Sequence, residues 1–405
     1  MLILSELREI IDHQRQKILN LKSHQRQLID ELEIIDNYAL VISGIRRCGK
    51  STLLSQLIKQ QNHGWLYLNF DTPRLFNFEF KDFRLLDQII SENDIKTLYF
   101  DEIQVVNQWE IYVRGKLDEG YQVVVTGSNA SMLSRELGTK LTGRHITKEL
   151  FPFSYREFCE FQNMDFNHQS LNSYLEIGGM PQYISSGNTE VLHTLVNDIL
   201  YRDIAVRYNI RNDRSLRHLI MFLVANVGNL ISANKLKTLI GVKSVNTIQE
   251  YLSFFEAGYL IQLGPRFNYS YRVQLVNPRK IYFIDNGIQA AISPSFSPDW
   301  GQRLENMVFW ELRRQNFELF YYNENNAECD FVVTRNGDVQ ILIQVCQSLN
   351  ADNMHREAEG LTNAMEYFNL LKGYIITLNQ RDTMVSEEKS IEVIPAYNLE
   401  ELFCS

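Results

Sequence analysis

Eight residues near the start of the chain have the types and the spacing of a phosphate-binding loop. The run Gly44-Ile45-Arg46-Arg47-Cys48-Gly49-Lys50-Ser51 fits the pattern G-x-x-x-x-G-K-[ST]. Its glycines allow backbone N–H groups to turn inward around a phosphate, and the helix expected to begin there adds partial positive charge. Lys50 is expected to reach the β- and γ-phosphates of a nucleotide, and the Ser51 hydroxyl to bind Mg²⁺. The sequence therefore predicts a nucleotide site formed by residues 44–52, with Thr52 as its last member.

Two adjacent carboxylates further along the chain complete this chemistry. Asp101 and Glu102 end the mostly apolar run 97–100, which is typical of a buried parallel strand. Ligand-binding groups of α/β folds lie at the carboxyl ends of such strands, so Asp101 is the expected Mg²⁺ partner of Ser51. Glu102 is the group expected to polarise an attacking water. Alone, this run would fit a strand and a solvated acidic turn, but together with Lys50 it predicts hydrolysis of a nucleoside triphosphate.

Alternating strands and helices are expected to position these residues. The apolar run 40–42 precedes the loop, and the helix-forming run 52–58 follows it. Residues 5–36 are polar, with Leu and Ile at helical spacing, and predict one or two amphipathic packing helices without chemistry of their own. Further elements are predicted as strands at 65–70, 97–101 and 121–126 and as a helix at 82–93. The pattern indicates an α/β fold with a parallel sheet.

Composition narrows the class of protein. With 405 residues the chain is expected to hold two to four domains, and its 45% hydrophobic and 22% charged residues are typical of a globular protein. No window approaches 18 uninterrupted apolar residues, and the N-terminus becomes charged too early for a signal peptide, so a cytoplasmic setting without membrane contact is expected. The five cysteines lack C-x-x-C spacing. A net charge of −9 argues against a broad nucleic-acid coat but leaves room for a local basic patch.

Several motifs, taken in order along the chain, resemble one family. They are GIRRCGKSTLL, LYFDEIQ, VVVTGSNASML, LTGR, FPFSYREF, the turn Gly178-Gly179-Met180-Pro181 and the run Tyr201-Arg202-Asp203-Ile204. Together they are similar to the AAA-type ATPases of prokaryotes, P-loop proteins whose C-terminal half is a separate domain of uncharacterised function. The resemblance covers essentially the whole chain. It implies that the nucleotide is ATP, bound with Mg²⁺ and hydrolysed, and it supports the roles given to Lys50, Ser51, Asp101 and Glu102.

Two further catalytic residues are expected on the strength of this resemblance. Asn129 follows the strand 121–126, where the family keeps sensor 1, a polar residue that detects the γ-phosphate. Ser128 is the near alternative, and a Ser/Asn turn that caps the next helix is another. Arg144, in the motif LTGR, is the candidate arginine finger, acting on the phosphates of its own chain or of a neighbour. An ordinary surface arginine is the alternative.

The expected fold class is α/β, a P-loop AAA-type parallel sheet followed by further domains, and the chain divides into five predicted segments. They are N-terminal helices at 1–36, an AAA-type ATPase core at 37–151, a helical lid at 152–210, a winged helix at 211–268 and a restriction-endonuclease-like α/β domain at 269–405. In the lid, Arg156 and Arg202 could reach a phosphate, but ion pairs with neighbouring acidic residues are favoured.

The winged helix is expected to read DNA or to bind a protein. Residues 232–241 predict a helix and a turn, a second helix is expected to be capped at Ser244, and 258–263 predict a wing strand. Six side chains suit phosphates and base edges, namely Lys235, Lys237, Lys243, Asn246, Thr247 and Gln249. Because many winged helices bind protein, and Glu250 and Glu256 dilute the basic face, both kinds of partner remain open.

The last predicted segment resembles the PD-(D/E)xK nuclease-like fold, whose metal site uses an Asp and then E-x-K on the following strand. Asp330 stands at the first position and Glu305 on a helix, but the E-x-K is replaced by Gln344-Val345-Cys346. A neutral amide thus replaces a carboxylate and a thiol replaces the lysine. Because hard cations select anionic oxygen ligands, we expect that nuclease chemistry has been lost and that a binding or scaffold domain remains.

Two classes of function remain open at this point. One is an ATP-driven switch or motor whose C-terminal half binds DNA or a protein partner. The other is an ATP-controlled DNA nuclease with an unorthodox metal site. The sequence leaves open whether the ATPase acts as a ring, a dimer or a monomer.

Overall fold

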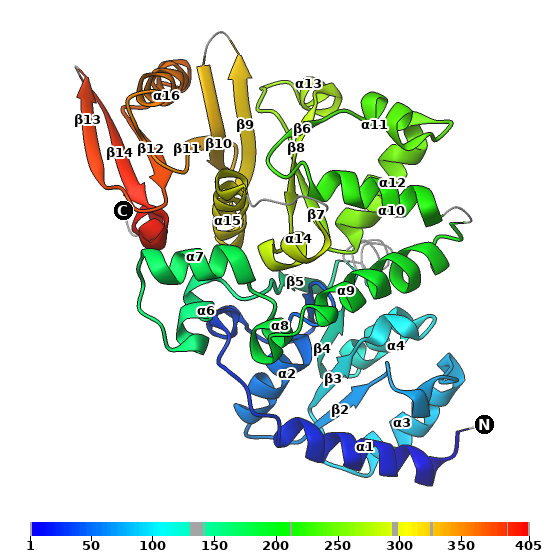
Figure 1. Cartoon of the computed structure of the whole chain (residues 1–405). Helices are drawn as coiled ribbons and strands as arrows, with labels where there is room; N and C mark the ends of the chain where they lie inside the picture. The colour runs from blue at the N-terminus through cyan, green and yellow to red at the C-terminus, as the bar shows by residue number, and fades with distance from the viewer. Residues whose placement is uncertain are drawn as a thin grey trace. The chain divides into compact units, whose positions relative to one another are not determined.

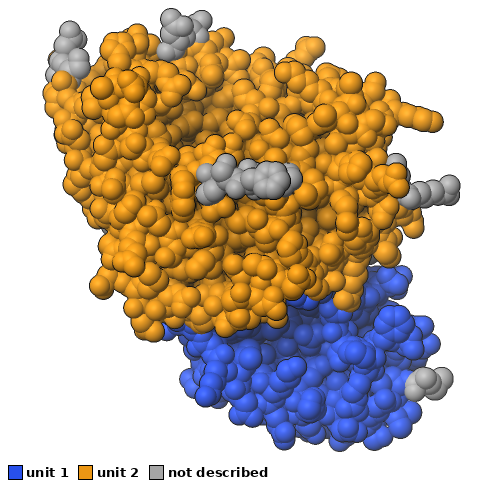
Figure 2. Space-filling model, in the orientation of Figure 1, with its two compact units in different colours: residues 1–151, 257–259 blue, residues 152–256, 260–405 orange. Residues whose placement is uncertain are grey.

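The computed structural model describes residues 2–129, 141, 143–210, 213–293, 299–324, 327–386 and 388–403 (Figure 1). The chain forms two units, coloured separately in Figure 2. Unit 1 comprises residues 1–151 and 257–259, and unit 2 comprises residues 152–256 and 260–405.

A five-stranded sheet in the order β2-β3-β4-β1-β5 forms the centre of unit 1. Its strands are β1 (Ala39–Ser43), β2 (Trp65–Asn69), β3 (Thr97–Asp101), β4 (Gln122–Gly127) and β5 (His145–Glu149). Every neighbouring pair is parallel, so the carboxyl ends of β1, β3 and β4 lie at one edge of the sheet. All residues of β1 and β3 are buried, which is why these strands read as almost continuous apolar runs. The predicted parallel sheet is confirmed.

Helices cover this sheet. They are α1 (Leu4–Leu19), η1 (Gln27–Glu31), α2 (Lys50–Lys59), η2 (Pro73–Leu75), η3 (Phe80–Asp82), α3 (Phe83–Ser91), η4 (Ile103–Val105) and α4 (Trp109–Asp118). The amphipathic α1 buries Leu7, Ile10 and Ile11 and packs on β2, as Figure 1 shows. These apolar side chains belong to the same core as Val41 and Phe100 of the sheet. The predicted N-terminal amphipathic helix is therefore confirmed.

The first half of unit 2 is mainly helical. Its elements are α6 (Tyr155–Gln162), α7 (His168–Ile177), α8 (Pro181–Ser186), α9 (Glu190–Asn197), the π-helical η5 (Asp198–Val206), α10 (Asp213–Val224), α11 (Ala233–Ile240) and α12 (Val245–Ala257). The Ser244 hydroxyl accepts a hydrogen bond from the N–H of Asn246 at 3.1 Å, which is the predicted cap of α12.

A small antiparallel sheet follows, in the order β6-β8-β7. Its elements, with the helices beside it, are β6 (Leu230–Ile231), β7 (Ile261–Gly264), α13 (Tyr271–Val276), β8 (Arg279–Phe283), α14 (Asn286–Ile292) and α15 (Trp300–Arg314). Ile231, the last residue of β6, pairs with Arg279, and Gly264, the last residue of β7, pairs with Lys280. Both strands therefore end at the same end of the small sheet. The helix α11 begins there after β6, and the connection to β8 begins there after β7.

A mixed six-stranded sheet in the order β13-β14-β12-β11-β10-β9 completes unit 2. Its elements are β9 (Glu318–Glu324), β10 (Ala327–Arg335), β11 (Asp338–Val345), α16 (Met354–Phe368), β12 (Lys372–Thr377), β13 (Asp382–Ser386), β14 (Lys389–Pro395) and η6 (Ala396–Phe403). Asn336 and Gly337 both have positive φ and join β10 to β11 in a hairpin turn. Helix α16 packs on β10 and β11.

Among the helices of the described residues, none combines the length and the apolar character that crossing a membrane requires.

Candidate functional site

The phosphate-binding loop lies between the carboxyl end of β1 and the start of α2, at the edge where ligands of parallel sheets bind. Gly49 has φ +105° and immediately precedes α2, a conformation that a side chain would strain. At Gly44 a Cβ atom would lie 2.1 Å from the backbone oxygen of Leu150, so no larger residue fits. Arg47 also has a positive φ, of 65°. The loop backbone is thus held in a compact turn at the N-terminus of a helix, which is the arrangement that binds phosphate.

Lys50 is buried beneath this loop. Its Nζ donates to the backbone oxygens of Gly44 at 3.0 Å and Ile45 at 3.2 Å. The same atom lies 3.3 Å from Oε1 of Glu102. Burial would lower the pKa of Lys50, but Glu102 and the other nearby acidic groups prevail and raise it. The lysine is therefore a fixed positive charge, as contact with phosphate oxygens requires.

Asp101, at the end of β3, accepts hydrogen bonds from four side chains. They come from Ser51 (2.6 Å), Tyr67 (2.8 Å), Asn69 (3.0 Å) and Thr126 (2.5 Å). Burial, together with the charge of Glu102, raises the pKa of Asp101, while three of these hydrogen bonds oppose the rise. The sequence did not single out Tyr67, Asn69 or Thr126, although Asn69 ends a strand that pairs directly with Asp101. The expected contact between Ser51 and Asp101 is present.

Glu102 adopts a left-handed backbone conformation with φ 52° and ψ 40°. A residue other than glycine rarely takes this conformation, and backbone strain of this kind is common at functional sites. Its Oε2 accepts hydrogen bonds from Gln104 at 2.6 Å and from Ser128 at 2.9 Å. Burial alone would raise the pKa of Glu102, but Lys50 and the two hydrogen bonds hold it below its ordinary value. The carboxylate is therefore ionised at neutral pH and suited to polarise a water.

The remaining residues of the predicted site lie around these groups. Arg46 pairs with Asp71, with Nη1 3.3 Å from Oδ2. The Cys48 thiol is buried, and burial raises its pKa, so it is not a thiolate at neutral pH. Of the two sensor candidates, Ser128 contacts Glu102, and Asn129 is the buried residue that follows it. The sensor role of Asn129 stays a prediction.

Arg144 lies at the opposite edge of the sheet. Its backbone oxygen accepts a hydrogen bond from the N–H of Ala39, the first residue of β1, whereas the phosphate loop follows the last residue of that strand. The two edges are separated by the length of β5, which is about 13 Å from its first to its last Cα atom. Its guanidinium pairs with Asp118 at 2.8 Å. The structure therefore does not bring Arg144 to the phosphate loop of its own chain, and only the intersubunit form of the arginine-finger prediction remains.

Unit 2 contains a second cluster of charged side chains. Lys280 of β8 donates from Nζ to Oδ1 of Asp330 at 2.6 Å and to Oε1 of Glu305 at 2.9 Å. All three side chains are at most 14% exposed. Burial and Asp330 raise the pKa of Glu305 to about 7, although Lys280 opposes the rise. The sequence predicted that Glu305 and Asp330 belong to one site. It did not predict Lys280, because no motif surrounds this residue.

Gln344 and Cys346 lie beside this cluster. The Gln344 amide donates to Glu357 at 2.8 Å, and its oxygen accepts the N–H of Asp330 at 3.1 Å. Burial, with Glu357 and Asp330 nearby, raises the pKa of Cys346 to about 12, so it is a neutral thiol. Within the described part of the chain, no three Asp, Glu, His or Cys side chains come together as a metal-binding group.

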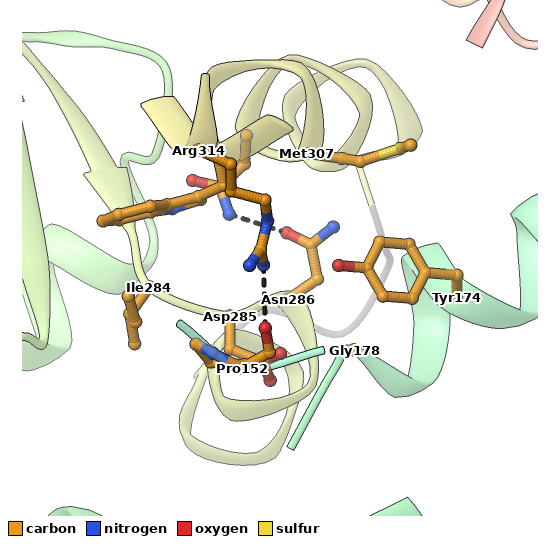
Figure 3. Close-up of a pocket in the computed structure, with 10 residues that line it drawn as sticks. Pro152, Tyr174, Gly178, Ile284, Asp285, Asn286, Met307 and Arg314 are labelled. Carbon is orange, nitrogen blue, oxygen red and sulfur yellow. Dashed lines mark hydrogen bonds between the residues drawn. The ribbon is translucent and has the colours of Figure 1, made fainter. Parts of the chain in front are cut away.

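Figure 3 shows a polar pocket inside unit 2, built around Asp285. The Asp285 carboxylate accepts hydrogen bonds from the N–H groups of Gly179 at 2.5 Å and Ile288 at 2.9 Å. Burial raises the pKa of Asp285 to about 6 despite these hydrogen bonds. The pocket has a volume of about 10 Å³. This is room for one water at most, so the pocket is part of the polar core and not a substrate site.

Comparisons with known proteins agree with the P-loop geometry. A sequence family described as "AAA domain" matches residues 36–159, so the chain carries a P-loop domain of the AAA-type ATPase class. Two families described as domains of unknown function match later parts of the chain, DUF8612 at residues 168–299 and DUF4143 at residues 300–399.

Two relatives cover most of the chain. An uncharacterized protein of Methanocaldococcus jannaschii is 35% identical over 398 residues, which are 90% of this chain and 88% of that protein. An uncharacterized protein of Haemophilus influenzae is 30% identical over 343 residues, which are 79% of this chain and 84% of that protein. The chain belongs to the family that these proteins define.

Two solved structures show a distant likeness. A Signal Transduction ATPase with Numerous Domains (STAND) protein with a tetratricopeptide repeat sensor from Pyrococcus horikoshii has a TM-score of 0.28 at 13% identity, covering 73% of this chain and 46% of that one. CDC6P from Pyrobaculum aerophilum has a TM-score of 0.27 at 14% identity, covering 71% of this chain and 91% of that one. At these scores the likeness carries no argument about activity or partners.

Proposed function

We propose that this protein is a Mg²⁺-dependent ATPase in which residues 44–52 bind the nucleotide. The observation that carries the proposal is the convergence of Lys50, Ser51, Asp101 and Glu102 at one edge of the parallel sheet, with Ser51 2.6 Å from Asp101 and Lys50 3.3 Å from Glu102. Release of phosphate from ATP by the purified chain tests it, with Lys50→Ala as the variant expected to lose nucleotide binding.

The donor groups fit a magnesium ion bound together with a nucleotide. Mg²⁺ is usually held by one or two carboxylates and the phosphates of the substrate, so a complete cage of protein ligands is not required. Ser51 and Asp101 would hold the ion, which when bound neutralises charge on the phosphate oxygens. The loop N–H groups and Lys50 bind the β- and γ-phosphates. Glu102 orients a water toward the γ-phosphorus and accepts its proton, while Ser128 fixes the carboxylate and Asn129 detects the γ-phosphate.

We further propose that the C-terminal half binds DNA through residues 230–283 and that ATP turnover controls this binding. Apart from the buried Lys280, the segment carries six Lys or Arg and only two Glu, in a chain whose net charge is −9. The cations Lys235, Lys237 and Lys243 lie on α11 and in the turn before α12, which suits a winged helix whose wing is the β7–β8 pair.

Exposed aromatic rings strengthen the case for a nucleic acid over a protein partner. Tyr269 and Tyr271, in the β7–β8 connection, are 78% and 71% exposed, and Arg272 beside them is exposed too. This connection leaves the small sheet at the end where α11 begins. Aromatic side chains interleaved with cations stack on bases while the cations bind phosphates. A protein partner is the alternative, and it takes precedence if duplex and single-stranded DNA both fail to bind.

DNA binding is expected to depend steeply on salt. Replacing Lys235, Lys237 and Lys243 with Ala should flatten the plot of log affinity against log salt by about 2–3 units, because each phosphate contact contributes a slope of about 0.9. Fluorescence anisotropy with labelled duplex DNA between about 50 and 200 mM salt measures this. The matched control replaces three exposed lysines outside the segment, Lys22, Lys96 and Lys372. An unchanged slope in the first triple variant would contradict the proposed surface.

For the Asp330 cluster we propose that nuclease chemistry has been lost. The Lys280 ammonium lies between the two carboxylates at 2.6 and 2.9 Å and so takes the place that a divalent cation would need. Gln344 supplies no negative charge, and Cys346 supplies no cation. The second candidate function, an ATP-controlled nuclease, is favoured only by the presence of a lysine near Asp330. Mg²⁺- or Mn²⁺-dependent DNA cleavage that disappears in Asp330→Ala would establish that second function.

For Arg144 we propose action on ATP bound by another copy of the chain, because it lies far from the loop of its own. Arg144→Ala is expected to lower turnover by about 10³-fold or more with little loss of ATP binding. Mixing it with Lys50→Ala chains should restore part of the activity, since each chain supplies what the other lacks. Asp118→Asn removes only the ion-pair partner and is the control. If both variants lose the same activity and mixing restores none, Arg144 has a structural role instead.

A further inference from the structure

Arg26 lies directly behind the phosphate loop, in a segment with no recognisable motif. It precedes η1, and its side chain is only 2% exposed. Nη1 donates to the backbone oxygen of Cys48 at 2.7 Å, inside the loop. Nη2 donates to the backbone oxygen of Phe151 at 2.7 Å, two residues after β5. One guanidinium thus joins three segments that are remote in sequence.

The loop is built to accommodate this cation. A Cβ atom at Gly49 would lie 3.2 Å from Nη1 of Arg26, so the glycine of the loop also provides the space for the guanidinium. The backbone N–H of Arg26 donates to Gln56 of α2 at 3.2 Å, and Gln56 in turn donates to the backbone oxygen of His24 at 2.6 Å. These hydrogen bonds therefore hold residues 24–26 against α2, the helix that begins at the loop.

A buried backbone carbonyl that lacks a hydrogen-bond donor is unfavourable. The position of the donor therefore fixes the orientation of the peptide group to which the carbonyl belongs. The C=O and N–H of a trans peptide point in opposite directions, so by binding the Cys48 oxygen Arg26 also fixes the direction of the Gly49 N–H, which belongs to the phosphate loop. The guanidinium also brings a permanent positive charge close behind the site.

We propose that Arg26 is a positioning residue that holds the phosphate loop in its nucleotide-binding conformation. The expected effect on nucleotide affinity rests on the proposed ATPase function, whereas the hydrogen bond between Arg26 and the loop is present without nucleotide. Loss of hydrogen bonds to a charged group commonly changes an equilibrium by about 10- to 100-fold. Arg26 touches no reacting atom, so nucleotide affinity should fall more than the turnover rate at saturating ATP.

The test compares Arg26→Met with Arg15→Met, using full-length protein. Arg15 is a matched control because it belongs to the same N-terminal region, where its guanidinium lies 4.7 Å from the ring of Trp65 at the amino end of β2. We expect Arg26→Met to bind fluorescent ADP and ATP analogues about 10- to 100-fold more weakly, and Arg15→Met to bind them like wild type. Added guanidinium ion should restore part of the affinity of Arg26→Met and should not change that of Arg15→Met.

Two further measurements separate this inference from the proposed function. Amide hydrogen exchange without nucleotide should be faster at residues 44–51 in Arg26→Met and unchanged in α3. Unchanged exchange in the loop, or wild-type nucleotide affinity in Arg26→Met, would overturn the inference. Failure of the wild-type chain to bind nucleotide would overturn the proposed function alone. If Arg26→Met does not fold, Arg26→Lys keeps the charge but not the fork of donors, and wild-type affinity in that variant would likewise overturn the inference.

Discussion

Glu102→Gln is expected to lower ATP turnover by about 10²–10⁴-fold while ATP still binds. The amide has the shape of the carboxylate and can keep its contact with Ser128, but it cannot accept a proton from water. Lys50 and the hydrogen bonds from Gln104 and Ser128 hold the pKa of Glu102 below its ordinary value, so the wild-type group is ionised at neutral pH. Turnover limited by this group should therefore decline only as the pH falls below the ordinary range of a glutamate.

Phosphate release and nucleotide titration on the same preparations measure the two quantities separately. Glu119→Gln is a suitable control, because this glutamate pairs with Lys116 and its side chain is 55% exposed. Lys50→Ala should lose nucleotide affinity, unlike Glu102→Gln. If Glu102→Gln turns over ATP at the wild-type rate, another group activates the water. If wild type has no turnover that either variant reduces, in the presence and absence of DNA, the ATPase proposal fails.

The parts of this site that could be predicted are those set by local backbone chemistry. A strand, a glycine-bounded loop and a helix follow one another without interruption, so the types of residues 44–51 determine the turn as well as its ligand. Asp101 ends a buried strand and Glu102 follows it, and parallel strands bring their carboxyl ends to one edge. Proximity to Lys50 and Ser51 then follows from the sheet alone.

The parts that could not be predicted depend on contacts between distant segments. Arg26 reaches Cys48 and Phe151 because α1 and η1 fold back onto α2, and no periodicity of the sequence encodes that path. Arg144 has the expected motif, but only the register of β5 against β1 reveals that it lies at the far edge of the sheet. Motifs predicted which groups take part in this chemistry, whereas strand register decided which of them meet.

Lys280→Met is expected to destabilise unit 2 by about 3–5 kcal/mol, the usual cost of breaking a buried ion pair from one side. Lys280 lies within 3 Å of both Glu305 and Asp330, at 2.9 and 2.6 Å, and its loss leaves two carboxylates buried without a cation. Amide hydrogen exchange of β10 and β11 reports the free energy of unfolding of this unit. The control is Lys372→Met, whose ion pair with Glu392 has side chains 45% and 37% exposed and should contribute only about 0–1 kcal/mol.

The destabilisation expected for Lys280→Met should also depend on pH. Burial and Asp330 raise the pKa of Glu305 from 4.5 to about 7, so the folded chain holds this proton more tightly than the unfolded chain. The stability that Glu305 contributes is complete below pH 4.5 and is lost as the pH rises through 7. Lys280→Met removes the charge that opposes this rise, so its destabilisation should be larger at pH 8 than at pH 5.

A variant with all charges removed, Lys280→Met with Glu305→Gln and Asp330→Asn, separates an ion-pair role from a metal-binding role. If the cluster is a structural ion pair, this triple variant should recover most of the lost stability, since well-packed neutral groups can replace a buried pair. Mn²⁺ should stabilise only Lys280→Met, where two carboxylates face each other without the ammonium, and should leave wild type unchanged. Stabilisation of wild type by Mn²⁺, accompanied by DNA cleavage that Asp330→Ala abolishes, would instead make Lys280 a catalytic lysine that reached the site from another strand.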